Sequence, residues 1–473
     1  MKRATTASFV LRLKLNTSSR DECILNKRFF YAFKIYNVLV NHVVKQINKV
    51  ETTKEYWDIK NNKTQVREYL KKYDLSLYQL EHFALAQQHK FKRDLDSNSV
   101  AKIAAKVWES CEKHFFGNGK SIHHRAYLNI RSIEGKSNKT GIRFCGNKIL
   151  WNKLSMSVTI PYNDAYAMEA LQHRVKYCRI YRIPINGRFH YYVDLILEGI
   201  PPKKHFQGTG RSGIDLGPST VAVITDYEAT LTELADTDIN NRYEQRIADI
   251  SRRMDISKRL SNPSNYNADG TPIKGKHDWT FTKTYKKLKY KKANVQRKQQ
   301  ANRRIYQNRL ANRILEQTDE VYIERMNIQE LSRKKKRKKG PHFGKSVTNY
   351  CPSQFESILE RKLNYSGHKL YKVNTYTFKA SQYNHIDDTY TKKKLNDRIT
   401  VVGDNVYQRD LYSAFLLMNS KSDLQSTDRT LCFANEPSFK TLHDYCMDEL
   451  IATSKKYPSS FGIEEYKKLK ATK

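Results

Sequence analysis

The stretch Gly213-Ile214-Asp215-Leu216-Gly217, followed by Val221-Ala222-Val223, decides the fold class of this chain. Its apolar residues predict a strand and its glycines predict a tight turn. Such a strand brings the carboxylate of Asp215 to a turn, where an acidic side chain is well placed to hold a metal. Alone the signal is weak, because many buried strands contain a stray aspartate.

Two further carboxylates lie in similar contexts downstream. Glu324 ends the apolar run 321–323, which predicts a second strand, and Asp410 stands at the start of an amphipathic helix. Mg²⁺ is a hard cation that prefers oxygen ligands, and two such ions about 4 Å apart can activate water and stabilise the leaving oxygen of a phosphodiester. Three acids on three elements therefore predict a site for two Mg²⁺ ions.

The order and context of Asp215, Glu324 and Asp410 resemble those of RuvC-like nucleases, a variant of the ribonuclease H fold. Strands expected over 221–225 and 229–234 complete a three-stranded meander, which is how that fold begins. The glycine run also opens the phosphate-binding hairpin of actin-like and Hsp70-like ATPases. That alternative expects a second such hairpin after a strand, and the pair Asp269-Gly270 lies in a polar loop, so the nuclease interpretation is preferred.

The charge of the chain points to an anionic partner. Lysine and arginine number 86 against 48 acids, which gives a formal net charge of +38 and a pI of about 9.7. Phosphate backbones are the obvious partner. A ribosomal or merely basic protein is the alternative, but 473 residues with 39% hydrophobic content can bury a sizeable core in two or three domains.

The cysteines and the hydropathy pattern indicate the compartment. The seven cysteines are odd in number and form no Cys-x-x-Cys pair, which favours reduced thiols. No apolar run has the length of a membrane span, and the N-terminus leads into a strand instead of a signal-peptide core. We expect a soluble prokaryotic cytoplasmic protein associated with the nucleoid and not with a membrane.

Two basic segments are candidates for nucleic-acid contact. Residues 283–313 predict a helix with twelve basic residues and no acid, and 333–339 is an unbroken basic run. The alternatives are a solvated face for the helix and a nuclear import signal for the run. The candidate phosphate-binding residues are Lys286, Lys287, Arg297, Arg303, Arg304, Lys334, Lys335, Lys336 and Arg337.

The first two hundred residues predict a β module interrupted by helices. Residues 9–15 alternate as a strand apart from Val10, and helices follow over 27–116 with a cap expected at Ser97 or Ser99. Strands return over 141–160 and 175–197 around the turn Asn186-Gly187. The stretches 201–204 and 208–210 predict a linker into the nuclease domain.

The second half contains further predicted elements. Ser353 and Glu356 form a capping box that opens an amphipathic helix, Gly367 closes this helix, and a strand follows over 368–378. His385 is expected to be a surface side chain in a loop. A helix is expected over about 438–456 in a tail of unknown function.

At this level the chain resembles the TnpB proteins of insertion sequences and their descendants, the compact type V CRISPR-associated nucleases. In that family a β module interrupted by a helical lobe precedes a RuvC-like domain, and the family's three nuclease acids map onto Asp215, Glu324 and Asp410. The resemblance implies that a bound RNA guides the recognition of DNA beside a short adjacent motif.

The sequence departs from the family at two places. The family's four-cysteine zinc ribbon is replaced by 379–398, which keeps the Ser381-Gln382 anchor and Arg398 but has no cysteine, so we expect no zinc. Tyr412 stands where the family commonly has asparagine. Arg398 is our candidate for positioning the scissile phosphate, with a surface salt bridge as the alternative, and Asp404 is the next acid to consider if Asp410 is not a ligand.

The resemblance implies an α/β multidomain fold, with a β-barrel-like wedge module, a helical recognition lobe and a RuvC-like domain. The expected boundaries are wedge 1–20 and 121–205, helical lobe 21–120, nuclease 210–378 with a basic helical insert, degenerate zinc-ribbon-like subdomain 379–405, final nuclease helix 406–420 and tail 421–473.

We therefore expect a monomeric, Mg²⁺-dependent, RNA-guided DNA endonuclease whose partners are a guide RNA and double-stranded target DNA. A nuclease-inactive RNA-guided repressor and an unguided transposition accessory protein are the alternatives. The guide's origin, from a transposon end or a CRISPR array, stays open.

Overall fold

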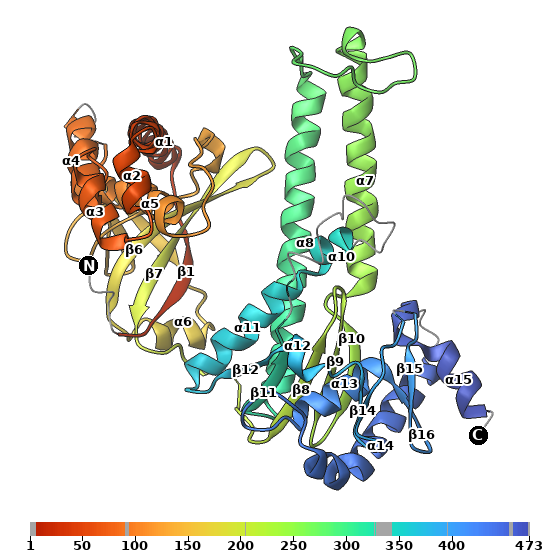
Figure 1. Ribbon diagram of the computed structural model, residues 1–473. Coiled ribbons are helices and arrows are strands. Elements are labelled where there is room, and N and C mark those ends of the chain that lie inside the picture. Colours follow the sequence, from red (N-terminus) through yellow and green to blue (C-terminus); the bar gives the residue numbers. More distant parts are fainter. Residues whose placement is uncertain are drawn as a thin grey trace. The chain divides into compact units, whose positions relative to one another are not determined.

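The computed structural model describes residues 6–89, 94–203, 205–325, 327, 343–394, 396–453 and 457–471. The chain divides into two compact units, Met1–Pro202 and Lys203–Lys473, and the division falls within the predicted linker 201–204. Figure 1 shows the elements of both units. Among the described residues, no helix combines the length and the apolar character needed to cross a membrane.

The first unit is built on an antiparallel sheet with strand order β2-β6-β7-β1-β5-β4-β3. Its strands are β1 (Ser8–Leu15), β2 (Ser132–Glu134), β3 (Arg143–Cys145), β4 (Lys148–Trp151), β5 (Leu154–Thr159), β6 (Val175–Ile185) and β7 (Arg188–Glu198). The alternation predicted for β1 is confirmed, since Phe9, Leu11, Leu13 and Leu15 are buried while Val10 is exposed.

The hairpin between β6 and β7 turns where the sequence predicts it. Asn186 and Gly187 both take left-handed backbone conformations, with φ of 50° and 87°. A two-residue turn with both residues left-handed matches the twist of the flanking strands, which explains the preference for Asn-Gly.

Helices fill the interval between β1 and β2, as predicted. They are α1 (Ser19–Glu51), α2 (Lys54–Ile59), α3 (Lys63–Lys71), α4 (Leu77–Gln88) and α5 (Ser97–Phe116), followed by the 3₁₀ turn η2 (Tyr127–Asn129), and α6 (Ala165–Ala170) lies between β5 and β6. The predicted cap of α5 is wrong: Asp96, not Ser97 or Ser99, accepts from the backbone N–H of Ser99 at 3.0 Å. Asp96 also accepts from the indole N–H of Trp151 at 2.7 Å, so this side chain joins the helix to the sheet.

The second unit contains a mixed sheet with strand order β10-β9-β8-β11-β12. Its strands are β8 (Arg211–Leu216), β9 (Thr220–Thr225), β10 (Ala229–Glu233), β11 (Glu320–Glu324) and β12 (Leu370–Val373). The predicted meander is confirmed, because β9 pairs antiparallel with both β8 and β10. β11 runs parallel to β8 and to β12.

Both faces of this sheet are covered. The face bearing Ile214, Val223 and Ile323 packs on the end of α8 (Lys283–Leu315) and on α11 (Pro352–Tyr365). The opposite face, bearing Ala222 and Tyr322, packs on α13 (Arg409–Met418) and α14 (Arg429–Ala452).

The basic segment 283–313 is helical, as predicted, and belongs to a long hairpin inserted between β10 and β11. α7 (Thr237–Leu260) packs along α8 through a small core of Ile250, Leu288 and Val295. Figure 1 shows these two helices side by side, projecting from the sheet of their unit.

The elements from α10 (Gly344–Tyr350) to β12 follow the predictions in part. The buried face of α11 is confirmed, and Gly367 has the left-handed φ of 84° expected beyond a helix end. The predicted capping box is wrong, because Pro352 starts the helix and Cys351 precedes it without a side-chain cap. β12 ends at Val373, since Asn374 caps a helical turn, α12 (Thr375–Phe378).

The C-terminal part folds onto the sheet. It consists of β13 (Tyr383–Asn384), β14 (Thr389–Tyr390), β15 (Ile399–Val402), β16 (Asn405–Gln408), α13, α14, the 3₁₀ turn η4 (Ser459–Phe461) and α15 (Ile463–Ala471), while another 3₁₀ turn, η3 (Pro263–Asn265), follows α7. The tail helix is longer than expected. Phe439 of α14 and Tyr466 of α15 lie in one core with Tyr407, Tyr412 and Phe415.

Gly213 generates a prediction, because α13 crosses β8 at this residue without room for a side chain. A Cβ built there would lie 1.9 Å from the carbonyl oxygen of Ala414 and 2.5 Å from the backbone nitrogen of Met418. We expect Gly213→Ala to lower the free energy of unfolding by about 3 kcal/mol or more, since helix backbone cannot yield as a side chain can. Denaturant unfolding measures the change.

The matched control is Gly135→Ala, where a Cβ would meet its nearest neighbours at 3.4 Å. The control should change stability by less than about 1 kcal/mol. Equal effects of the two substitutions would contradict the close approach of α13 to β8.

Candidate metal and nucleic-acid site

Asp215 and Glu324 end two neighbouring parallel strands. The register pairs Ile323 of β11 with Ile214 of β8, so the next residue of each strand is one of these acids. Side chains alternate between the faces of a strand. Ile214 and Ile323 lie in the core beneath α11, so Asp215 and Glu324 lie on the opposite face, which α13 covers.

Asp410 reaches the same face from the first turn of α13. Gln408 caps this helix by accepting from the backbone N–H of Leu411 at 2.8 Å. Ala414, one turn after Asp410, is the residue whose carbonyl lies against Gly213. The close approach at Gly213 therefore brings the start of α13 to the end of β8, where Asp215 lies.

The charges of Asp410 and Glu324 act on Asp215. Burial, and then the negative charges of Asp410 and Glu324, hold the pKa of Asp215 well above its ordinary value, while Arg409 and Arg398 act to lower it. Burial also raises the pKa of Glu324 to about 7, against the opposing effect of a hydrogen bond with the backbone of Ala380.

The side chains of the three acids do not form a complete metal-coordination site. Within the described ranges, no group of three or more His, Cys, Asp or Glu side chains is arranged so that it could hold a metal ion. The donor set nevertheless fits Mg²⁺, because all three groups offer carboxylate oxygens and a cation would offset the charge that raises the pKa of Asp215.

Two arginines border the acids, and the sequence analysis identified one of them. Arg398 is half-buried and acts on Asp215 electrostatically. Arg409 was missed, although it directly precedes Asp410. Its guanidinium lies 3.3 Å from Asp410 Oδ1 and donates to the backbone carbonyl of Asp397 at 2.8 Å, so it fixes the loop before β15 to the start of α13.

The candidate phosphate-binding residues on α8 divide into two groups. Lys286, Lys287 and Arg304 are exposed, and Arg297 is half-buried with its guanidinium donating to Asn294 at 2.9 Å. Arg303 departs from the expectation, because only 8% of its surface is exposed. It donates to the backbone carbonyl of Asn349 at 2.7 Å, so its role is to hold α10 against α8. The candidates Lys334, Lys335, Lys336 and Arg337 lie outside the described residues.

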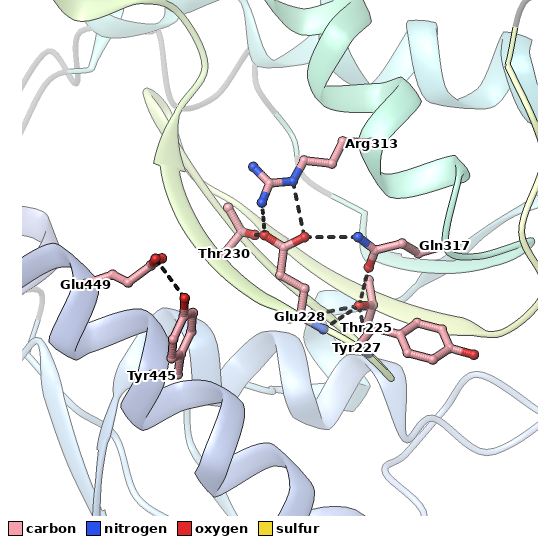
Figure 2. A network of polar contacts seen from close by, with 8 residues as sticks. All are labelled: Thr225, Tyr227, Glu228, Thr230, Arg313, Gln317, Tyr445 and Glu449. Atoms are coloured by element: carbon pink, nitrogen blue, oxygen red, sulfur yellow. Dashed lines mark hydrogen bonds and ion pairs between the residues drawn. The ribbon is translucent and has the colours of Figure 1, made fainter.

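The C-terminal end of α8 is anchored to the β9–β10 turn by a polar network, which Figure 2 shows. Both Arg313 and Gln317 donate to the carboxylate of Glu228, the latter at 3.0 Å. Gln317 also accepts from the hydroxyl of Thr225 at 2.7 Å. Arg313 is thus neutralised by Glu228, and the basic surface of the helix is carried by residues that precede it.

The segment 379–394 folds around aromatic side chains. The rings of Tyr383 and Tyr390 lie across the β13–β14 pair with centroids 4.8 Å apart, and the Tyr383 hydroxyl donates to Asp388 at 2.8 Å. Its zinc content remains a prediction.

His385 is buried and not at the surface, so that expectation was wrong. Its Nδ1 lies 2.8 Å from the hydroxyl of Tyr412, and its Nε2 lies 3.4 Å from Glu436 of α14. Burial lowers the pKa of His385. Tyr412 is therefore bonded within the C-terminal core.

His443 is a second buried histidine that the sequence analysis missed. Its Nε2 accepts from the backbone N–H of Gln408 at 2.9 Å, and its Nδ1 lies 3.0 Å from Asp444, which also accepts from Tyr466. Since Nε2 is the acceptor, Nδ1 carries the proton. Helices α14 and α15 thus support Gln408, which caps α13, the helix that carries Asp410. No local signal marks this role, because Gln408 and His443 are 35 residues apart.

Comparisons with known proteins give structural matches at low sequence identity. No family model and no curated protein matches the sequence. The cryo-EM structure of a Cas12f1-sgRNA-target DNA complex matches with 11% identity and a TM-score of 0.45, covering 86% of this chain and 98% of that chain. A cryo-EM structure of a CRISPR-Cas12f ternary complex matches with 11% identity and a TM-score of 0.27, covering 85% and 82% respectively.

The raised pKa of Asp215 generates a stability prediction. A carboxyl whose pKa is higher in the folded than in the unfolded state destabilises the fold when it is ionised, and this cost is lost as the pH falls through the folded pKa toward the unfolded value near 4. In chelator, we expect Asp215→Asn to raise the free energy of unfolding at pH 7.5 by roughly 1–2 kcal/mol, with a smaller gain at pH 5.

Thermal unfolding in EDTA at the two pH values measures this gain. Asp255→Asn removes the same charge from an exposed position of α7 and should change stability by less than about 0.5 kcal/mol. If the wild type and Asp215→Asn are equally stable at pH 7.5, the acids do not repel one another.

Proposed function

We propose that this protein is an RNA-guided DNA endonuclease with a RuvC-like site formed by Asp215, Glu324 and Asp410. The observation that carries the proposal is the convergence of these acids on one face of the second unit's sheet. The pKa values of Asp215 and Glu324 are raised, and the charge of Asp410 contributes to the shift at Asp215. The strand order β10-β9-β8-β11-β12, with an antiparallel meander followed by two parallel strands, supports a ribonuclease H fold.

The three carboxylates would hold two Mg²⁺ ions, which supply an activated water and stabilise the leaving oxygen. The chain's own groups prepare this chemistry. Gly213 lets α13 approach, His443 and Gln408 fix the start of that helix, and Arg409 ties it to the loop before β15. We assign to Arg398, whose charge acts on Asp215, the binding of a phosphate beside the acids.

Guide RNA and target DNA are the proposed partners. The net charge of +38 exceeds what solubility requires, and the exposed lysines and arginines of α8 follow one long helix, as a surface that tracks a phosphate backbone would. The aromatic packing of the segment 379–398 supports a subdomain that needs no zinc.

The central prediction concerns the three acids. We expect Asp215→Ala, Glu324→Ala and Asp410→Ala to abolish DNA cleavage and to leave guided DNA binding within about threefold of wild type, because binding depends on phosphate contacts and base pairing. The assay combines plasmid cleavage and gel-shift binding, with Mg²⁺ or Ca²⁺ and with the RNA that co-purifies. Ca²⁺ should support binding and not cleavage, since its larger coordination shell positions water poorly.

Two results would change the assignment. If the wild type binds guided DNA and never cuts it under Mg²⁺, the protein is a guided repressor. If Asp410→Ala cuts normally, Asp410 is not a ligand and Asp404 becomes the next acid to test.

A further prediction concerns the basic helix. Replacing the exposed Lys286, Lys287, Lys298 and Arg304 together by glutamine should flatten the slope of log K against log salt by about 3–4 units, roughly one per lost phosphate contact. The control replaces Lys440, Lys467, Lys468 and Lys470 of α14 and α15, which removes the same charge elsewhere. Equal slopes for the two variants would remove α8 from the interface.

A further inference from the structure

A pocket of about 250 Å³ lies between the first turns of α7 and the middle of α8. None of the three acids lines it, so it is separate from the candidate metal site. Its lining combines apolar surface with a few polar groups. The apolar part includes Ile239 and Ile305, which are 38% and 52% exposed, and the ring of Tyr306.

The Tyr306 ring is held in place. Its hydroxyl lies 3.0 Å from the hydroxyl of Thr232 on β10, which fixes the outer edge of the ring to the sheet. A fixed aromatic ring beside exposed isoleucines provides a surface on which a flat, apolar group can pack.

The polar groups of the pocket suit the edge of a heterocycle. The side-chain amide of Asn302 donates to the hydroxyl of Tyr243 at 3.1 Å, which orients the amide. In the part of the chain that the structure describes, no hydrogen bond to its Oδ1 is recorded, so this oxygen remains an acceptor. Asp236 and Arg309 also line the pocket and supply an acceptor and donors at its rim.

The charge around the pocket indicates what brings such a group there. Arg309 is exposed, and no acid contacts it within the described ranges. Lys298, about three turns earlier on the same face of the helix as Arg309, is also exposed. A phosphate backbone that follows these residues would pass the pocket, and an unstacked base of that strand presents a flat face and a hydrogen-bonding edge.

We propose that this pocket binds a single unstacked nucleobase of the nucleic acid held on α8. The proposal rests on the proposed function only in requiring that α8 contacts a nucleic acid. RNA and DNA share the chemistry of the base, so the experiment distinguishes the two sources.

The test compares two single-stranded probes that differ only in their bases. One is a fluorescein-labelled 20-nucleotide strand of mixed sequence, made as RNA and as DNA, and the other is a fully abasic strand with the same number of phosphates. Kd is measured by fluorescence anisotropy over a range of salt concentrations for the purified protein freed of co-purifying RNA.

The variants are Asn302→Leu, which keeps the branched shape of the side chain and removes its amide, and Ile305→Asn, which places an uncharged polar group on the exposed apolar wall. Each should weaken binding of the base-bearing probe by about 5- to 100-fold, the range expected for loss of base stacking, and leave the abasic probe and the salt slope unchanged. The nucleic acid, RNA or DNA, whose binding these variants weaken more is the one that supplies the base.

Arg304→Gln on the same helix is the matched control. It should weaken both probes equally and flatten the salt slope by about one unit. If both pocket variants bind the base-bearing probe as the wild type does, the pocket assignment is overturned while nucleic-acid binding on α8 stands. If the wild type binds neither probe, both the pocket assignment and the proposed function fail.

Discussion

The second unit depends on the direct contact between the backbone of α13 and the backbone of β8. A glycine at 213 is required there, because the carbonyl of Ala414 occupies the place of a side chain. This contact sets the distance between the sheet and α13 and so determines which side chains meet at the sheet's edge.

The convergence of the acids has a thermodynamic cost that the surrounding cations reduce and do not remove. Arg398 and Arg409 lower the pKa of Asp215, yet burial and the neighbouring carboxylates keep it raised. Arg409 is also engaged with backbone carbonyls, so part of its hydrogen-bonding capacity is already used. We therefore expect the stability to be lower than it would be with neutral side chains, as is common where a site is built to receive a cation or a substrate.

The sequence predicts the parts of this fold that are encoded locally. The alternation in β1, the Asn186-Gly187 turn and the buried face of α11 depend on neighbours a few residues away, and all three are confirmed. The failures involve distant partners. His385 is buried by α13 and α14, and Asp96, which caps α5 in place of the expected serines, also binds Trp151. Arg303 and Lys286 are both basic residues of one predicted helix and look alike in the sequence. Arg303 is buried because it bonds to α10, whereas Lys286 has no such neighbour among the described residues and is exposed.

The support of α13 by the end of the chain has a consequence for biosynthesis. His443 and Tyr466 belong to α14 and α15, and the chain is translated from its N-terminus, so β8 and β11 leave the ribosome well before the residues that fix the cap of α13. A nascent chain with Asp215, Glu324 and Asp410 already synthesised still lacks the core that holds the third acid in place. The residues that support the third acid are therefore synthesised only after the basic helices α7 and α8.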